Sequence, residues 1–148
     1  MTDELKFYTA GTYSAIAMPK RAGDAGYDLA VSDEVTIHAK SFIRVKLDLC
    51  VAIPAGYVGM IKDRSGQAAG GLHVLGGVID SGYRGTISVV FANFSEYSHT
   101  FTEGDRIAQL LILPIETPPL VRVDSVADLG DTERGERGFG STGLKVSA

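Results

Sequence analysis

The strongest constraint on the fold is a period-two pattern between Phe42 and Ile53. Alternate positions of this stretch are apolar: Ile43, Val45, Leu47, Leu49, Val51 and Ile53. Three of the positions between them carry charged side chains, namely Arg44, Lys46 and Asp48. Successive side chains of a β-strand point to opposite faces of a sheet, so this alternation predicts a half-buried strand over residues 42–53.

Shorter patterns of the same kind predict further strands at residues 35–37, 57–61, 86–91, 107–115 and 120–123. Turn sequences such as Pro54-Ala55-Gly56 and Glu103-Gly104-Asp105 lie between them. No window has a sustained helical stripe, although one or two helical turns are expected after Ser65. Many short strands with regular turns predict an all-β single domain, which could be a barrel, a sandwich or a jelly roll.

Composition limits the partners that this chain can have. It has 148 residues, 45% of them apolar, and its 14 Lys and Arg residues against 18 Asp and Glu residues give a net charge of −4. Stable nucleic-acid binding through bulk positive charge is therefore not expected, and any phosphate ligand must be held by a local site. The single cysteine, Cys50, excludes an internal disulfide. With no leader-like N-terminus and no long apolar run, the sequence predicts a soluble intracellular protein without membrane contact.

The C-terminal segment differs in composition from the rest of the chain. Residues 131–148 are rich in Gly, Ser and Thr, and they carry Arg134 and Arg137. Such a segment is too polar to form part of a core, so we expect a β-domain over residues 1–130 and a flexible C-terminal arm over residues 131–148.

Five short clusters combine glycine with charged or hydroxyl side chains. They span residues 25–29, 63–66, 77–85, 104–110 and 134–143. Each cluster taken alone is more typical of a turn than of a site. Taken together, however, they supply the guanidinium, hydroxyl and backbone N–H groups that bind phosphate, for example at Arg64, Ser65 and Arg134. Asp28 and Asp80 offer hard oxygen for Mg²⁺ or a base for water.

In their order and wording these clusters resemble the five motifs of the trimeric dUTPase family, with the match running from Ala25 to Gly143. The resemblance implies a jelly-roll-like β-barrel that forms a homotrimer with its sites at subunit interfaces. It implies Mg²⁺-dependent hydrolysis of dUTP to dUMP and pyrophosphate, which limits uracil incorporation into DNA and supplies dUMP for thymidylate synthesis. The expected location is the cytoplasm or nucleus, or the host cell if the source is viral.

The resemblance also assigns roles to three side chains. Asp80 would orient and deprotonate the water that attacks the α-phosphorus. Tyr83 would pack its ring on the deoxyribose and leave no room for a 2′-hydroxyl, although a half-buried strand tyrosine is the commoner fate of this residue type. Asp28 would hold Mg²⁺ through water, and alone it could equally cap a turn.

The remaining residues that the resemblance assigns would bind the substrate. Arg64, Ser65, Gly66 and Gln109 would bind the phosphate chain, whereas backbone groups around Gly77 and Val78 would read uracil. The C-terminal arm would cover base and phosphates with five residues: Arg134, Phe139, Gly140, Ser141 and Thr142. A glutamine in an apolar strand otherwise needs a partner, so Gln109 could instead bond within the core.

Asp63 departs from the family pattern, and Arg137 occupies a position that varies within the family. Asp63 stands where many relatives have proline or a small residue, and Arg137 is interpreted as a solvated surface charge.

Two other functions compete with dUTP hydrolysis. A dCTP deaminase shares the trimeric β fold and a phosphate site, but the run from Gly77 to Gly85 is of the dUTPase type. A nucleotide-sensing trimer without turnover is a third reading. No histidine lies at metal-ligand spacing, so no zinc site is expected.

Overall fold

The computed structural model describes residues 4–11, 15–17 and 21–138. The chain forms two compact units, Met1–Glu116 and Thr117–Ala148. The strands of the first unit are β1 (Lys6–Tyr8), β2 (Ile16–Ala17), β3 (Tyr27–Ala30), β4 (Val35–Ile37), β5 (Phe42–Lys46), β6 (Cys50–Ala52), β7 (Tyr57–Asp63), β8 (Leu72–Leu75), β9 (Val78–Ile79), β10 (Ser88–Asn93), β11 (His99–Phe101) and β12 (Arg106–Pro114). One short helix, α1 (Ser65–Ala69), follows β7, as the sequence predicts.

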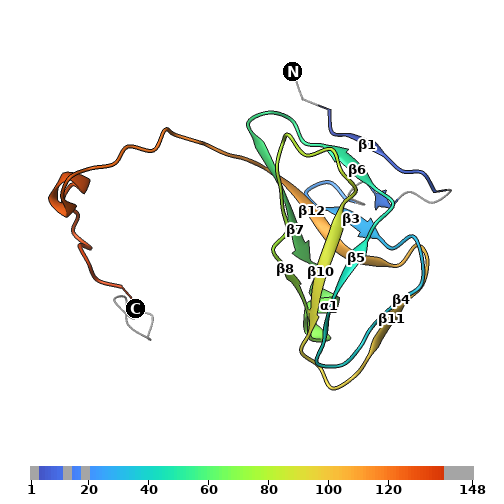
Figure 1. Ribbon diagram of the computed structural model, residues 1–148. Helices are drawn as coiled ribbons and strands as arrows, with labels where there is room; N and C mark the ends of the chain where they lie inside the picture. The colour runs from blue at the N-terminus through green and yellow to red at the C-terminus, as the bar shows by residue number, and fades with distance from the viewer. Residues whose placement is uncertain (1–3, 12–14, 18–20, 139–148) are drawn as a thin grey trace. The chain divides into compact units, whose positions relative to one another are not determined.

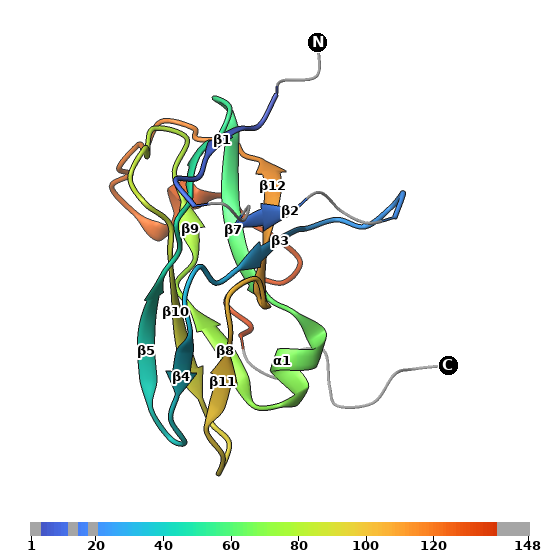
Figure 2. The same ribbon diagram turned by 90° about the vertical axis from the view of Figure 1, so that its right-hand side faces the viewer.

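The strands form four antiparallel groups around one core. The largest sheet has five strands in the order β2-β3-β12-β7-β9, and the next has three in the order β5-β10-β8. Two strand pairs, β1-β6 and β11-β4, complete the unit. Figure 1 shows β12 between β3 and β7, and Figure 2 shows α1 beside β8. The predicted all-β class is confirmed, with Leu29, Ile37, Phe91 and Ile107 among the fully buried core residues.

The predicted continuous strand over residues 42–53 is wrong in one respect. Hydrogen bonding divides it into β5, which pairs with β10, and β6, which pairs with β1. Between them the Leu47 N–H donates to the Ile87 carbonyl, and the Ile87 N–H donates to the Leu49 carbonyl. Leu47 and Leu49 are both buried, so the alternation identified the core face correctly while the strand changed its pairing partner.

The predicted strand at residues 120–123 is also wrong, because this segment has no strand structure. A strand needs a partner, and Pro118 and Pro119 immediately before the segment have no N–H to donate to one. The second unit instead contains a 3₁₀ helix, η1 (Val126–Leu129), which is closed by reciprocal bonds between Ser125 and Asp128. The predicted arm boundary at residues 130 and 131 stays a prediction.

Candidate functional site

An open pocket in the first unit collects residues from three of the five sequence clusters. Its volume is about 460 Å³, and the predicted residues that line it are Asp28, Arg64, Ser65, Gly66 and Gln109. Arg21, Asp24, Ala25, Gly26, Gln67 and Arg106 complete the lining, and we call this the Asp28 pocket. Segments far apart in the sequence therefore meet as the phosphate-binding prediction requires.

Ion pairs organise the floor of the Asp28 pocket. The Arg64 Nε lies 2.9 Å from Asp28 Oδ1, and the Arg106 Nη1 lies 2.7 Å from Asp28 Oδ2. The Arg64 Nη1 also donates to the Arg106 carbonyl at 3.1 Å. One carboxylate thus fixes two guanidinium groups, and the cluster keeps a net charge of +1, which suits an anionic ligand.

Arg106 was missed from the sequence because a β-bulge redirects it. Strict alternation along β12 would place Arg106 on the same face as Ala108 and Leu110, which are buried. The register between β12 and β3 shifts between Arg106 and Ala108, so Arg106 instead shares a face with Asp28. The signal in the sequence was the pair of consecutive apolar residues, Ile107 and Ala108, which interrupts the alternation.

Gln109 lies opposite Asp28 in the strand register, next to the ion pairs. Its Nε2 donates to the Asp63 carbonyl at 2.7 Å, which satisfies one of its two N–H bonds within the protein. A Cβ added at Gly26 would lie 2.5 Å from the Gln109 Oε1, so only glycine leaves room for this amide. Both readings of Gln109 are therefore compatible: it bonds inside the fold and still faces the pocket.

The third sequence cluster forms a separate site, a turn over residues 80–85 that we call the Asp80 turn. Asp80 and Tyr83 line a smaller pocket of about 250 Å³ together with Arg44, Val78 and Ser88. Asp80 is exposed, and its carboxylate has no hydrogen bond or ion pair within the described part of the chain. It therefore retains its lone pairs for a water molecule.

Tyr83 is not the half-buried strand tyrosine of the alternative reading. It lies in the turn with 43% of its surface exposed, and its hydroxyl donates to the Thr86 carbonyl at 3.0 Å. Its ring packs over Gly85, where an added Cβ would lie 2.6 Å from the Tyr83 Cζ. The ring is thus held at one side of a pocket, as a steric role requires.

Gly77 and Val78, the predicted uracil readers, join the Asp80 turn to β7. Gly77 has a φ of +96°, and a Cβ there would lie 2.7 Å from the Ile61 carbonyl oxygen. Its own carbonyl accepts from the Ile61 N–H at 2.8 Å, and Val78 pairs with Met60. This close approach explains why the position is glycine.

The fifth sequence cluster is described only as far as residue 138. Arg134 and Arg137 bond reciprocally, each Nε donating to the other's carbonyl at 2.9 and 3.0 Å. Arg137, interpreted as a plain surface charge, therefore also shapes the turn that carries Arg134. The other predicted arm residues, namely Phe139, Gly140, Ser141 and Thr142, lie outside the described residues.

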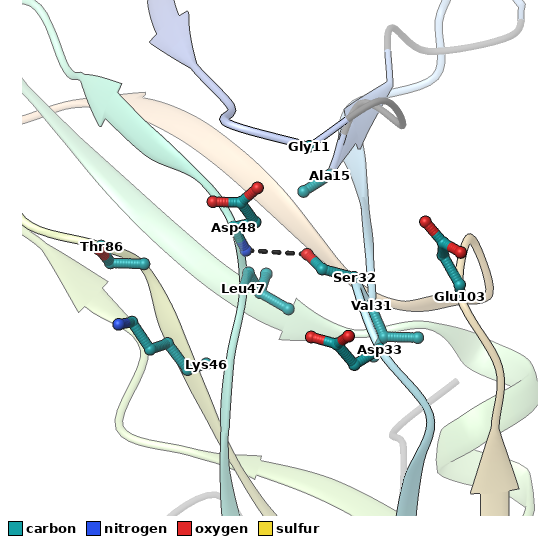
Figure 3. A pocket seen from close by; sticks show the side chains of 10 residues that line it. All are labelled: Gly11, Ala15, Val31, Ser32, Asp33, Lys46, Leu47, Asp48, Thr86 and Glu103. Carbon is teal, nitrogen blue, oxygen red and sulfur yellow. Dashed lines mark hydrogen bonds between the residues drawn. The ribbon is translucent and has the colours of Figure 1, made fainter.

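A third hollow contains none of the predicted residues. Figure 3 shows the side chains of Asp33, Asp48 and Glu103 around it, and the Ser32 hydroxyl accepting from the Asp48 N–H at 3.0 Å. Within the described ranges, no group of three or more His, Cys, Asp or Glu side chains is placed to hold a metal ion.

The geometry of Asp28 suits Mg²⁺ as an ion that arrives with phosphates. Both Asp28 oxygens already pair with guanidinium groups, so direct coordination would break these pairs. Contact through a bound water leaves them intact, and Mg²⁺ commonly keeps several waters while phosphates supply the other ligands.

Comparison with known proteins finds relatives that match nearly the whole chain. A family model of dUTPases matches residues 12–143. The deoxyuridine 5′-triphosphate nucleotidohydrolase of fowlpox virus is 36% identical over 144 residues, covering 97% of this chain and 99% of that protein. The enzyme of the same name from Mycolicibacterium gilvum is 44% identical over 140 residues, covering 89% of this chain and 91% of that protein.

Solved structures show the same fold. A mutant dUTPase of Staphylococcus bacteriophage 80alpha with dUpNHpp has a TM-score of 0.86 and 29% identity, covering 97% of this chain and all of that one. A mutant dUTPase from phage phi11 of S. aureus, with a structural Mg(II) ion, has a TM-score of 0.76 and 27% identity over 84% of this chain and 99% of that one. In the part of the chain that the structure describes, no helix is long and apolar enough to span a membrane.

These similarities confirm the predicted fold and the predicted function, dUTP hydrolysis, at the level of the family. The coverage extends over nearly the whole chain, and it includes the Asp28 pocket and the Asp80 turn. The chain belongs to the dUTPase family.

Proposed function

We propose that this protein hydrolyses dUTP to dUMP and pyrophosphate with Mg²⁺, using the Asp28 pocket for the phosphate chain and Asp80 for the attacking water. The observation that carries the proposal is the convergence of Arg64, Ser65, Gly66 and Gln109 on one open, locally cationic pocket. A net acidic chain with such a pocket favours a small polyanionic ligand over nucleic acid.

Asp80 is suited to act as general base. Its exposed carboxylate has no bonding partner among the described residues, so it can accept a proton from water while the water oxygen attacks the α-phosphorus. The bond between the α-phosphorus and its bridging oxygen then breaks, and pyrophosphate leaves with the electron pair. Bound Mg²⁺ would neutralise phosphate charge and increase the electrophilicity of phosphorus.

We further propose that the working enzyme is a homotrimer with its sites at subunit interfaces. In one chain β9 pairs with β7 at Gly59 and Met60, whereas Arg64 follows the opposite end of β7. The five residue-to-residue steps from Gly59 to Arg64 span about 16 Å of extended strand, and the antiparallel β9 leads Asp80 farther away. An Asp80 turn from a second chain would bring base and phosphates together.

The remaining assignments are part of the same proposal. Backbone groups at Gly77 and Val78 would bond the uracil edge, and a mismatched base would leave them unpaired at a cost of about 1–3 kcal/mol each. Tyr83 would exclude the 2′-hydroxyl of a ribonucleotide. The substrate belongs to intracellular nucleotide pools, so we propose an intracellular site of action.

The C-terminal arm over residues 131–148 would close over the bound nucleotide. Arg134 would reach the terminal phosphate, Phe139 would stack on uracil, and the Gly140-Ser141-Thr142 run would cover the phosphates. Truncation after Leu129 should abolish most turnover and leave the ligand-free unfolding temperature nearly unchanged. Retained activity, or collapse of the fold, would show that the arm is not a catalytic lid.

Pyrophosphate release from dUTP tests the proposed function directly. We expect release from dUTP with Mg²⁺, loss of release on chelation of the metal, and far slower release from dTTP, dCTP and UTP. Ammonia released from dCTP would identify a deaminase instead. Sedimentation would test the assembly, since a fully active monomer at micromolar concentration contradicts the trimer.

A further inference from the structure

Asp63, the residue that departs from the family pattern, is bonded through every acceptor it has. Its Oδ2 lies 2.7 Å from the Nδ1 of His73, and its Oδ1 accepts from the Val74 N–H at 2.6 Å. Its carbonyl accepts from the Gln109 Nε2 at 2.7 Å. No other role has been given to Asp63 or His73 in the site described above.

These bonds close the base of the loop that carries the phosphate ligands. Asp63 ends β7 in the five-stranded sheet, whereas His73 and Val74 belong to β8 in the three-stranded sheet. Residues 64–72 lie between these two anchors, and they include Arg64, Ser65 and Gly66 of the Asp28 pocket. The Asp63 carboxylate therefore joins the start of the loop to the strand that follows it.

Hydrophobic packing fixes only the end of this loop, where Leu72 is buried in the core. The helix within it, α1, buries none of its side chains, and its N-cap residue Arg64 makes no side-chain cap bond. The loop is instead held by polar contacts, including Arg64 with Asp28 and the Gln67 Nε2 donating to the Arg106 carbonyl at 3.1 Å. Its placement is thus sensitive to the bonds at its two ends.

The Asp63 carbonyl also determines how the Gln109 amide is oriented. With the Nε2 directed to this carbonyl, a flipped amide would set two oxygens against each other. The second N–H of the Gln109 amide stays available for a phosphate oxygen. Asp63 thus orders the loop through its side chain, and its backbone carbonyl orients the amide donor of Gln109.

We propose that Asp63, with His73 as its partner, is a positioning residue that holds the loop over residues 64–72 in the geometry that binds the triphosphate. The inference rests on the proposed function of the Asp28 pocket and adds a specific prediction. Loss of the carboxylate weakens phosphate binding and leaves the binding of base and sugar unchanged, because among the described residues the Asp63 hydrogen bonds reach His73, Val74 and Gln109 and neither Gly77 nor Tyr83.

The test compares four variants of the full-length protein: Asp63→Ala, Asp63→Asn, His73→Ala and His38→Ala. Each is assayed for KM and kcat with dUTP, for affinity for dUpNHpp, and for inhibition by the nucleoside deoxyuridine. Asp63→Ala should raise KM and the dUpNHpp dissociation constant about tenfold with kcat changed less than about threefold, since it removes two bonds to a charged acceptor.

The other three variants should change KM by smaller amounts or not at all. Asp63→Asn can still accept from the Val74 N–H, so its KM should be intermediate. His73→Ala removes a half-exposed partner and should raise KM about threefold. His38→Ala alters another exposed histidine outside the Asp28 pocket and should change nothing. Inhibition by deoxyuridine should be the same in all four.

Three results would overturn the inference. The first is a folded Asp63→Ala protein with unchanged dUpNHpp affinity. The second is an equal weakening of dUpNHpp and deoxyuridine binding, which indicates a general loss of structure. If Asp63→Ala does not fold, the His73→Ala protein provides the test. The third result is an unchanged dUpNHpp affinity of that protein. The binding assays need no turnover, so a wild-type protein that fails to release pyrophosphate contradicts the proposed function separately.

Discussion

The Asp28 pocket and the Asp80 turn use an aspartate in opposite ways. Asp28 reaches Arg106, 78 positions away along the chain, and its two oxygens bind two guanidinium groups. The Asp80 turn is held by contacts inside residues 80–86, such as the Tyr83 N–H with the Asp80 carbonyl and the Tyr83 hydroxyl with Thr86. One site is assembled by tertiary structure, and the other is local.

This difference matches the chemistry proposed for each place. A phosphate site needs cations held in position before the ligand arrives, and a partly buried carboxylate that pairs with both provides this. A general base must bind a water molecule, so an aspartate already bonded to arginine would be a poor choice. In the proposed mechanism, ion pairing would mark the binding side of the site, and the unbonded carboxylate would mark the side that acts on water.

Asp80→Asn should give the largest change in turnover, and it is the strongest test of the contrast between Asp80 and Asp28. The amide is nearly isosteric but cannot accept the proton, so kcat should fall about 10²–10⁴-fold while the unfolding temperature stays unchanged. Asp33→Asn, at another exposed aspartate, is the matched control and should keep wild-type turnover. A kcat for Asp80→Asn within tenfold of wild type would remove Asp80 from the proposed mechanism.

Gly77→Ala tests the close contact between Gly77 and Ile61, which joins the start of the Asp80 turn to β7, the strand that precedes Arg64. An added Cβ meets the Ile61 carbonyl, and a φ of +96° strains any other residue, so we expect about 3 kcal/mol loss in the free energy of unfolding. Gly76→Ala has a φ of +70° with open space around it and should cost only about 1 kcal/mol. Equal losses in urea unfolding would contradict the close contact.

Asp28→Asn should affect stability and binding together, unlike Asp80→Asn. Two guanidinium groups would lose their counter-charge in a partly buried place, which should cost about 2 kcal/mol and raise KM about tenfold. Glu96→Gln breaks the exposed pair with Lys40 and should cost less than about 0.5 kcal/mol. An Asp28→Asn protein as stable as wild type would mean that the ion pairs do not organise the pocket.

Gly85→Ala should give the smallest effect, confined to sugar selection. The new methyl group would displace the Tyr83 ring, so the ratio of kcat/KM for UTP to that for dUTP should rise about threefold. Gly82→Ala has open space around its Cβ and serves as the control. If both variants keep the wild-type ratio, Tyr83 does not select against the 2′-hydroxyl.

The sequence determined the secondary structure class, six of the twelve strands in the described part of the chain, and the candidate site residues. Alternation identified Leu47 and Leu49 as core residues, because burial on one face of a strand follows directly from a period of two. The resemblance of the five clusters identified the family, because short glycine-containing motifs carry chemistry in a fixed order. The motifs point to Asp28, Arg64 and Gln109 without any information on how close these residues lie in space.

Only the tertiary structure decided how those residues meet. The partner change between β5 and β6 depends on Ile87, which lies in another segment, and no local pattern encodes it. Arg106 entered the pocket through a bulge that exists only when β12 pairs with β3. The bonds that Asp63 makes to His73 and Gln109 likewise join three separate segments, since contact between distant residues is a property of the packed chain and not of its local sequence.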